Sequence, residues 1–155
     1  MLTTTQPLIH AHFVSVIESI TPNYEGYNEC YFKYVEELPG EVSSNEIRVF
    51  VLNFSVAEPV ENGLFSLGEE YAFDMEIEIA YGGLPKEHAP WLITQDSVQI
   101  RTILLAQLAP TLEGLLSVRR IQFTPISNED GHWYGYHLFR IHYMHDTEVS
   151  IPPIV

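Results

Sequence analysis

Seven histidines are the residues of this chain best suited to binding a metal ion. His10 and His12 share one face of the strand predicted there, and His142 and His145 lie close together in the sequence. Imidazole nitrogens are common zinc ligands, so these four could in principle hold zinc. No helical ligand spacing supports such a site, and strand histidines more often lie at polar edges or beside carboxylates. We therefore expect no metal and no other cofactor.

Neighbouring carboxylates and a single cysteine suggest two further kinds of chemistry. General acid–base catalysis needs one carboxylate whose pKa is raised by burial, whereas Asp74, Glu76 and Glu78 read as a solvated row. Cys30 beside a histidine could act as a nucleophile, but a lone cysteine within a strand is more often a small buried hydrophobic residue. We therefore expect a protein that is not an enzyme, and a histidine-based enzyme ranks last among the alternatives.

Aromatic side chains concentrate near the C-terminus. Core filling accounts for most of the nine tyrosines and eight phenylalanines of the chain. Aromatic residues on both faces of one segment cannot all be internal in a thin domain, and exposed aromatic surface marks protein-binding grooves. We predict that four of them contact a client polypeptide: Trp133, Tyr136, Phe139 and Tyr143.

Charge is the strongest feature of the composition. Twenty-one acidic residues outnumber seven basic ones, which gives a formal net charge of -14. Such a surface repels nucleic acids and anionic membranes, so we expect no nucleic-acid partner. A basic partner, or solubility alone, explains the charge better.

Length and cysteine usage indicate one domain in a reducing compartment. A chain of 155 residues that is 46% hydrophobic can build one core. Its one cysteine allows no intramolecular disulfide. The N-terminus lacks the segments of a signal peptide, and the longest apolar run, around 103–116, is too interrupted to span a bilayer. We expect a cytoplasmic protein that does not insert into membranes.

Among the secondary-structure elements that must position these residues, the clearest is a strand with one apolar and one acidic face. From Tyr71 to Tyr81 large apolar residues alternate with smaller and acidic ones. Side chains alternate between the faces of a strand, so this pattern predicts one buried face and one acidic face. Asp74, Glu76 and Glu78 on the acidic face are candidates for docking a partner.

Three further strands are predicted before this one, over Ile9–Ile20, Cys30–Glu37 and Glu46–Ala57. A helix is predicted to follow, from Ser97 towards Leu116, with Asp96 as its N-cap. Its apolar residues surround most of the circumference, so a second subunit should cover it. The residues assigned to this oligomer interface are Met75, Ile77, Ile100, Leu104 and Leu108.

The segment after the helix has two interpretations. Arg120–Ile126 and Trp133–Met144 read as two strands of a hairpin, and a short second helix is the competing interpretation. Residues 146–155 form an extended tail, which leaves one domain over residues 1–145. The predicted fold is α+β, with a four-stranded antiparallel sheet followed by a long apolar helix.

The stretch Leu67–Gly83 resembles the SecB-type protein-export chaperone family. The match consists of Leu67-Gly68-Glu69-Glu70, then Ala72-Phe73, Glu76 and the pair Gly82-Gly83. The resemblance implies a dimer of dimers that captures unfolded chains without ATP. It also implies an acidic sheet face that docks the export motor ATPase, at the place of Asp74 and Glu76. The segment after the helix departs from the family pattern, which favours a specialised relative, such as a chaperone dedicated to an antitoxin.

The leading hypothesis is therefore an ATP-independent holdase that binds unfolded clients, a preprotein or an antitoxin, in apolar grooves. The alternative is an acidic phage or defence-system protein that binds and inhibits a single folded partner. Suppression of aggregation separates the two, because a holdase protects several clients and an inhibitor protects none.

Overall fold

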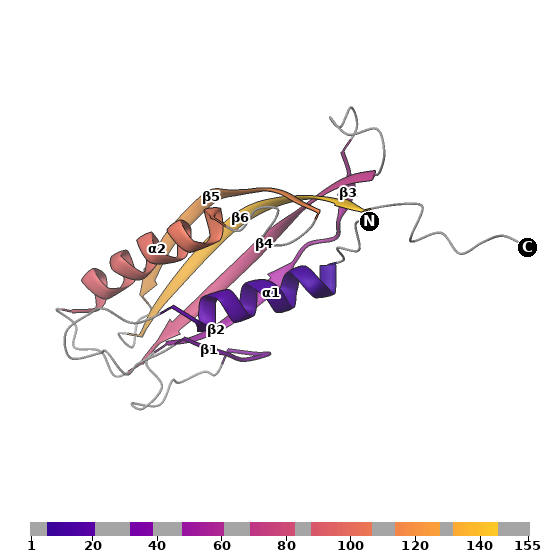
Figure 1. Ribbon diagram of the computed structural model, residues 1–155. Helices are drawn as coiled ribbons and strands as arrows, with labels where there is room; N and C mark the ends of the chain where they lie inside the picture. The colour runs from indigo at the N-terminus through magenta and orange to yellow at the C-terminus, as the bar shows by residue number, and fades with distance from the viewer. Residues whose placement is uncertain are drawn as a thin grey trace, which may run out of the picture.

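The computed structural model describes residues 6–20, 32–38, 48–60, 69–82, 88–106, 114–127 and 132–145. The elements follow one another as α1 (Gln6–Glu18), β1 (Lys33–Tyr34), β2 (Arg48–Phe54), β3 (Glu58–Pro59), β4 (Glu69–Tyr81), α2 (Ala89–Leu105), β5 (Leu115–Ser127) and β6 (Trp133–His145) (Figure 1). Neither helix in these ranges has the length and apolar content needed to cross a membrane.

The described strands form one mixed sheet in the order β1-β2-β4-β6-β5, with the short β3 paired to β4. β1 runs parallel to β2, and all the other pairs are antiparallel. The prediction of a four-stranded antiparallel sheet followed by a long apolar helix is therefore wrong. The sheet continues beyond the helix because β6 pairs along the whole of β4 and separates it from β5.

The first element is a helix, so the strand predicted over Ile9–Ile20 is wrong. α1 buries Ile9, Phe13 and Ile17 completely. Positions four apart share a face in a helix and also in a strand, so these three residues alone do not separate the two structures. The residues between them are half-buried or exposed, which is the pattern of a helix with one buried side.

α2 begins and ends earlier than the helix predicted from Ser97 towards Leu116. It starts beside Pro90, which suits the first turn of a helix because no backbone N–H is needed there. Asp96 is therefore an interior residue rather than the predicted N-cap. At the other end, Leu115 and Leu116 belong to β5.

Four predicted strands are confirmed. The strand predicted over Glu46–Ala57 is β2, the two-faced strand from Tyr71 to Tyr81 is β4, and those over 120–126 and 133–144 are β5 and β6. β5 and β6 pair antiparallel, so the hairpin interpretation is right and the short second helix is wrong. Of the strand predicted over Cys30–Glu37, the described residues form only the two-residue β1. The predicted tail lies outside the described residues.

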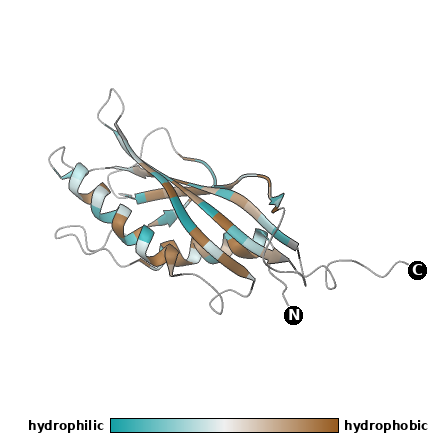
Figure 2. Cartoon of the chain, turned by 90° about the horizontal axis from the view of Figure 1, so that it is seen from above, coloured by the Kyte–Doolittle hydropathy of each residue, from teal (hydrophilic) through white to brown (hydrophobic). Residues whose placement is uncertain are grey.

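Both helices cover the same face of the sheet, as Figures 1 and 2 show from two directions. The core fills the space between this helical layer and the sheet. Its fully buried side chains come from both helices and from the central strands, and they include Ile9, Phe13, Ile17, Phe50, Met75, Ile77, Ile79, Leu92, Ile100, Leu104, Phe139 and Ile141. The opposite face of the sheet remains as a candidate surface for binding.

A buried polar network crosses this core. Arg48 of β2 donates to Asp96 of α2, from Nε to Oδ2 at 2.8 Å and from Nη2 to Oδ1 at 2.9 Å. The Tyr81 hydroxyl of β4 donates to the same Oδ2 at 3.0 Å. The Phe32 ring centroid lies 5.1 Å from the Arg48 guanidinium carbon. Arg48 and Asp96 are 1% and 0% exposed, so the network binds α2 to two strands without contact with solvent.

β5 is an edge strand with two irregularities in its pairing with β6. One lies between Arg120 and Gln122 and leaves Ile121 outside the pairing. Such a bulge shifts the alternation of faces by one residue. Arg120 and Phe123 therefore point to the same side, the one that α2 covers, while Arg119 points to the other side.

Candidate functional site

The candidate site is the face of the sheet opposite the helices, which we call the open face. Its centre is β4, where Asp74, Glu76 and Glu78 lie opposite the buried row of Met75 and Ile77. Glu76 and Glu78 are exposed and Asp74 is half-buried. The alternation predicted for this strand is confirmed, because the helices require only one apolar face of the sheet.

Two side chains of β6 contact this acidic row. The Tyr136 hydroxyl donates to Glu76 Oε1 at 3.0 Å, and Arg140 Nε donates to Asp74 Oδ1 at 3.1 Å. Burial raises the pKa of the Tyr136 phenol, and the hydrogen bond and charge of Glu76 raise it further. The phenol is therefore a hydrogen-bond donor at neutral pH. Within the described ranges Glu78 forms no ion pair, so the row keeps a net negative charge.

The basic side chains of the open face lie beside the acidic row. Arg119 of β5 and Arg140 of β6 are direct partners across the two strands, and both are exposed. Like charges placed directly opposite each other in a sheet are destabilising. On β6, Arg140 directly faces Asp74, whereas Leu138 and Tyr136 face Glu76 and Glu78. A ligand that crosses the strands from Glu76 or Glu78 would meet acidic, then apolar or aromatic, then uncharged polar groups, because Gln122 and Thr124 of β5 follow there. It would meet the two arginines only in the row of Asp74.

Part of the open face is not accessible. Val49, Val51 and Ala80 point to this side of the sheet, yet they are 0%, 6% and 0% exposed. The accessible area therefore extends from Glu78 towards Asp74 and across to β6 and β5.

The four aromatic residues predicted to contact a client do not lie together. Tyr136 lies on the open face and is half-buried. Phe139 and Tyr143 point to the helical side and are buried, and Trp133 packs against the same core. Successive side chains of a strand point to opposite faces, so a cluster that is contiguous in sequence is divided between the two faces of β6. One continuous groove lined by all four does not form.

The residues predicted at an oligomer interface lie inside a single chain. Met75, Ile77, Ile100 and Leu104 are each 0% exposed. The prediction assumed that one sheet could not cover the helix, whereas α1, β5 and β6 all contact α2. These four side chains therefore offer no surface to a second subunit. Leu108 lies outside the described residues.

The histidines considered as zinc ligands are dispersed. His10 and His12 point to different sides of α1, because two positions span more than half a turn of a helix. His10 Nε2 lies 2.8 Å from a backbone carbonyl oxygen of β2, and His142 Nδ1 lies 3.9 Å from Glu70 Oε1. Across the ranges that the structure describes, no three histidine, cysteine or acidic residues gather closely enough to hold a metal ion. Cys30 lies outside these ranges.

Sequence reasoning missed two features that involve α2. Trp91 and Val98 are 68% and 58% exposed on this helix. The helix predicted to be buried on all sides began at Ser97, so it included Val98 but not Trp91. Their spacing of seven positions indicates a shared helix face and could have revealed them. Arg101 of α2 and Arg120 of β5 line one pocket. No local pattern in the sequence brings these two arginines together.

No protein-family model matches this chain, and no curated protein matches it. The choice of function therefore depends on the surfaces described above. The resemblance of Leu67–Gly83 to the SecB-type family stays a prediction.

Proposed function

We propose that this chain is a non-enzymatic binding protein whose open face docks a basic polypeptide surface. The observation that carries the proposal is the row of exposed acids on β4, on a sheet face that neither described helix covers. Antiparallel strands such as β4, β6 and β5 are stable with one face covered, so the accessible part of their other face is available for a partner. Two of these acids, Asp74 and Glu76, are those at which the SecB resemblance implies docking.

Electrostatics and side-chain chemistry support a basic protein as the partner. The net charge of -14 attracts cations over a long range and repels nucleic acid. Next to the acids, Tyr136 and Leu138 supply an amphipathic ring and an apolar side chain of the kind that anchors protein interfaces. A segment with alternating basic and apolar side chains fits this arrangement.

Reversing two of these charges tests the proposal. The double variant Glu76→Lys, Glu78→Lys is expected to weaken binding of a fluorescently labelled peptide of alternating lysine and leucine roughly tenfold. Its free energy of unfolding should change by less than about 1 kcal/mol, because both side chains are exposed. Fluorescence anisotropy measures binding, and urea denaturation measures stability.

Two controls separate the open face from general charge attraction. Glu36→Lys, Glu37→Lys changes the net charge equally at exposed positions outside the sheet, and it should leave binding nearly unchanged. A peptide of alternating glutamate and leucine should not bind. If both double variants weaken binding equally, the open face is not the docking site. If charge reversal unfolds the protein, the acids are not an outer face.

The exposed apolar side of α2 favours a second function, ATP-independent binding of unfolded client segments. Trp91 lines a pocket of about 540 Å³ on this helix. Val98 and Gln99 line the same pocket and also a second one of about 460 Å³. Exposed apolar side chains beside such pockets fit the apolar side chains of an unfolded chain. Weak contacts of this kind gain strength when several copies act together.

A holdase activity would depend on these two side chains. Trp91→Ser, Val98→Ser is expected to abolish suppression of aggregation for three unrelated proteins diluted from denaturant, because it removes the two exposed large apolar side chains of α2. Native stability should stay within about 1 kcal/mol of the wild type, since both residues are largely exposed. If the unaltered protein protects none of the three, the holdase function is wrong and docking of one folded partner remains. Light scattering on the same samples gives the oligomeric state.

A further inference from the structure

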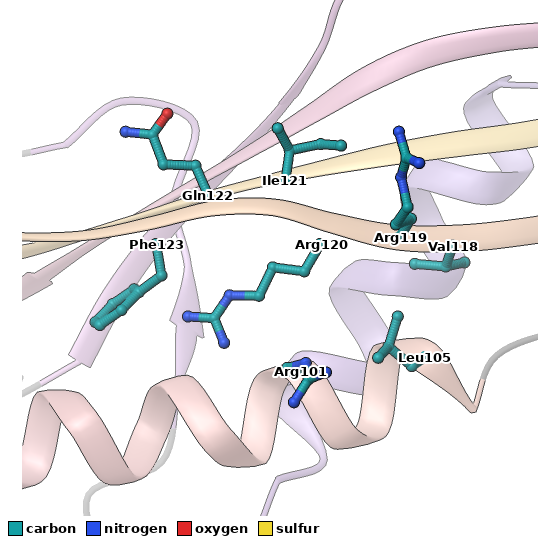
Figure 3. Close-up of a pocket in the computed structure, with 8 residues that line it drawn as sticks. All are labelled: Arg101, Leu105, Val118, Arg119, Arg120, Ile121, Gln122 and Phe123. Atoms are coloured by element: carbon teal, nitrogen blue, oxygen red, sulfur yellow. The ribbon is translucent and has the colours of Figure 1, made fainter.

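A pocket of about 580 Å³ lies between α2 and the edge strand β5 and is open to solvent. Figure 3 shows which side chains point into it. Arg101 and Leu105 come from α2, and Val118, Arg120 and Phe123 come from the side of β5 that faces the helix. Arg119, Ile121 and Gln122 also border the pocket, but their side chains project from the opposite side of β5.

The two arginines in the pocket have contrasting surroundings. Arg101 is exposed, whereas Arg120 is half-buried and is held in place by other groups. The Arg120 guanidinium donates a hydrogen bond from Nη2 to Ser97 Oγ, and its carbon lies 4.9 Å from the Phe123 ring centroid. The bulge at Ile121 makes this ring contact possible, because it places both side chains on one face. Arg120 is therefore preorganised.

Among the described residues, the positive charge of this pocket has no acidic partner. In the part of the chain that the structure describes, no carboxylate forms an ion pair with Arg101 or Arg120. Burial lowers the pKa of Arg120, and the neighbouring charge of Arg101 lowers it further. This chain has three acids for each base, twenty-one against seven, so two neighbouring arginines without an acid are unexpected on composition alone.

We propose that this pocket binds a small-molecule oxyanion of the phosphate monoester class, held between the guanidinium groups of Arg101 and Arg120. Arginine donates in a planar fork that matches phosphate oxygens, and two guanidinium charges match a dianion. Leu105 and Val118 form apolar walls for the organic part of the ligand. The volume lies within the range of small-molecule sites, about 300 to 1,000 Å³. This site lies apart from the acids of β4 and goes beyond the binding of a polypeptide.

Titration calorimetry at pH 8 and constant ionic strength tests the site, with inorganic phosphate, phenyl phosphate and acetate as separate ligands. Both phosphates should bind to one site per chain, and phenyl phosphate should bind more tightly because its ring contacts the apolar walls. Acetate should bind at least tenfold more weakly than phosphate, because it carries one charge. Arg101→Gln should weaken phosphate binding about tenfold or more, since it removes a charged hydrogen-bond donor.

Arg119→Gln is the matched control, since Arg119 is next to Arg120 in sequence but points away from the pocket. It should leave phosphate affinity within about twofold. Arg120→Lys keeps the charge but loses the fork, so it should also weaken binding while circular dichroism confirms a folded protein. Equal weakening by the changes at Arg101 and Arg119 would mean diffuse attraction and overturn the proposal. Absence of binding at 20 mM phosphate, or equal affinity for acetate, would also overturn it.

Discussion

Asp96→Asn is expected to lower the free energy of unfolding by about 3 to 5 kcal/mol, the usual effect of removing one partner of a buried ion pair. Asp96 accepts two hydrogen bonds from Arg48 and one from Tyr81, and it is fully buried. Burial raises the pKa of the Asp96 carboxyl, and Arg48 opposes that rise by favouring the charged form. An amide in this place would leave the positive charge of Arg48 in the core without the carboxylate that faces it. Urea denaturation followed by circular dichroism measures the loss.

Asp74→Asn is the control for this prediction. It removes one partner of the exposed Asp74–Arg140 pair and should cost less than about 1 kcal/mol. The double change Arg48→Met, Asp96→Leu should recover much of the stability lost in Asp96→Asn, because apolar residues of similar size can replace a buried pair. If Asp96→Asn costs no more than Asp74→Asn, the buried network does not stabilise the fold as we describe.

His137 is expected to make the protein less stable as the pH falls below neutrality. The side chain is 0% exposed, and in the described part of the chain neither ring nitrogen has a hydrogen-bond partner. Its ring lies between Phe123 and Phe139, at centroid distances of 4.8 and 6.5 Å. Burial, and then the charge of Arg120, lowers the pKa of the imidazole from 6.5 to about 3.

The sign of the effect follows from proton binding. Between pH 6.5 and about 3 the unfolded chain binds a proton at His137 that the folded chain excludes, so acid favours unfolding. At pH 4.5 the loss is about 2 to 3 kcal/mol relative to pH 7.5, at about 1.4 kcal/mol for each pH unit.

The variant His137→Phe isolates the contribution of His137 to the pH dependence of stability. It should be at least as stable as the wild type at pH 7.5, because a buried imidazole without partners is replaced by a ring that needs none. The difference in the free energy of unfolding between variant and wild type should then be larger by about 2 to 3 kcal/mol at pH 4.5, in favour of the variant. His137→Leu should show the same change with pH, which separates proton binding from ring packing. Parallel stability curves for wild type and both variants from pH 7.5 to 4.5 would contradict the prediction.

The parts of the fold that were predictable from the sequence are those in which the residue pattern within one segment is enough to indicate its structure, without knowledge of the segments that pack against it. β4 alternates along its whole length, so both its faces were predicted correctly before any partner strand was known. β2, β5 and β6 were also recognisable from their β-branched and aromatic residues. Their order in the sheet was not, because the position of β6 between β4 and β5 depends on pairing between distant segments.

The two helices show why the rest was missed. In α1 the spacing of Ile9, Phe13 and Ile17 fits both a helix and a strand, and apolar residues at the positions between them were interpreted as the second face of a strand covered on two sides. In α2 Asp96 has the residue type of a helix cap, yet its partner is Arg48, 48 positions earlier in the chain. A local pattern cannot distinguish a cap from a buried ion pair.

The candidate surfaces were predictable to different degrees. The acidic row of the open face was predicted because it lies on a single strand. The pocket at β5 was not, since it needs the bulge at Ile121 and the approach of α2 together. The predicted client groove failed for a related reason, because β6 divides its aromatic residues between two faces.

The central pair of strands has a consequence for how this protein folds. β6 is the strand that pairs along the whole of β4, and their contacts join distant positions such as Asp74 and Arg140, 66 residues apart. Closing such large loops comes before any of these contacts can stabilise the chain, so high contact order slows folding to about milliseconds to seconds. Until β6 arrives, β4 carries an unpaired edge beside a row of large apolar side chains. Charged side chains beside an apolar strand disfavour association between copies of an incompletely folded chain, and the acids on the other face of β4 have this property.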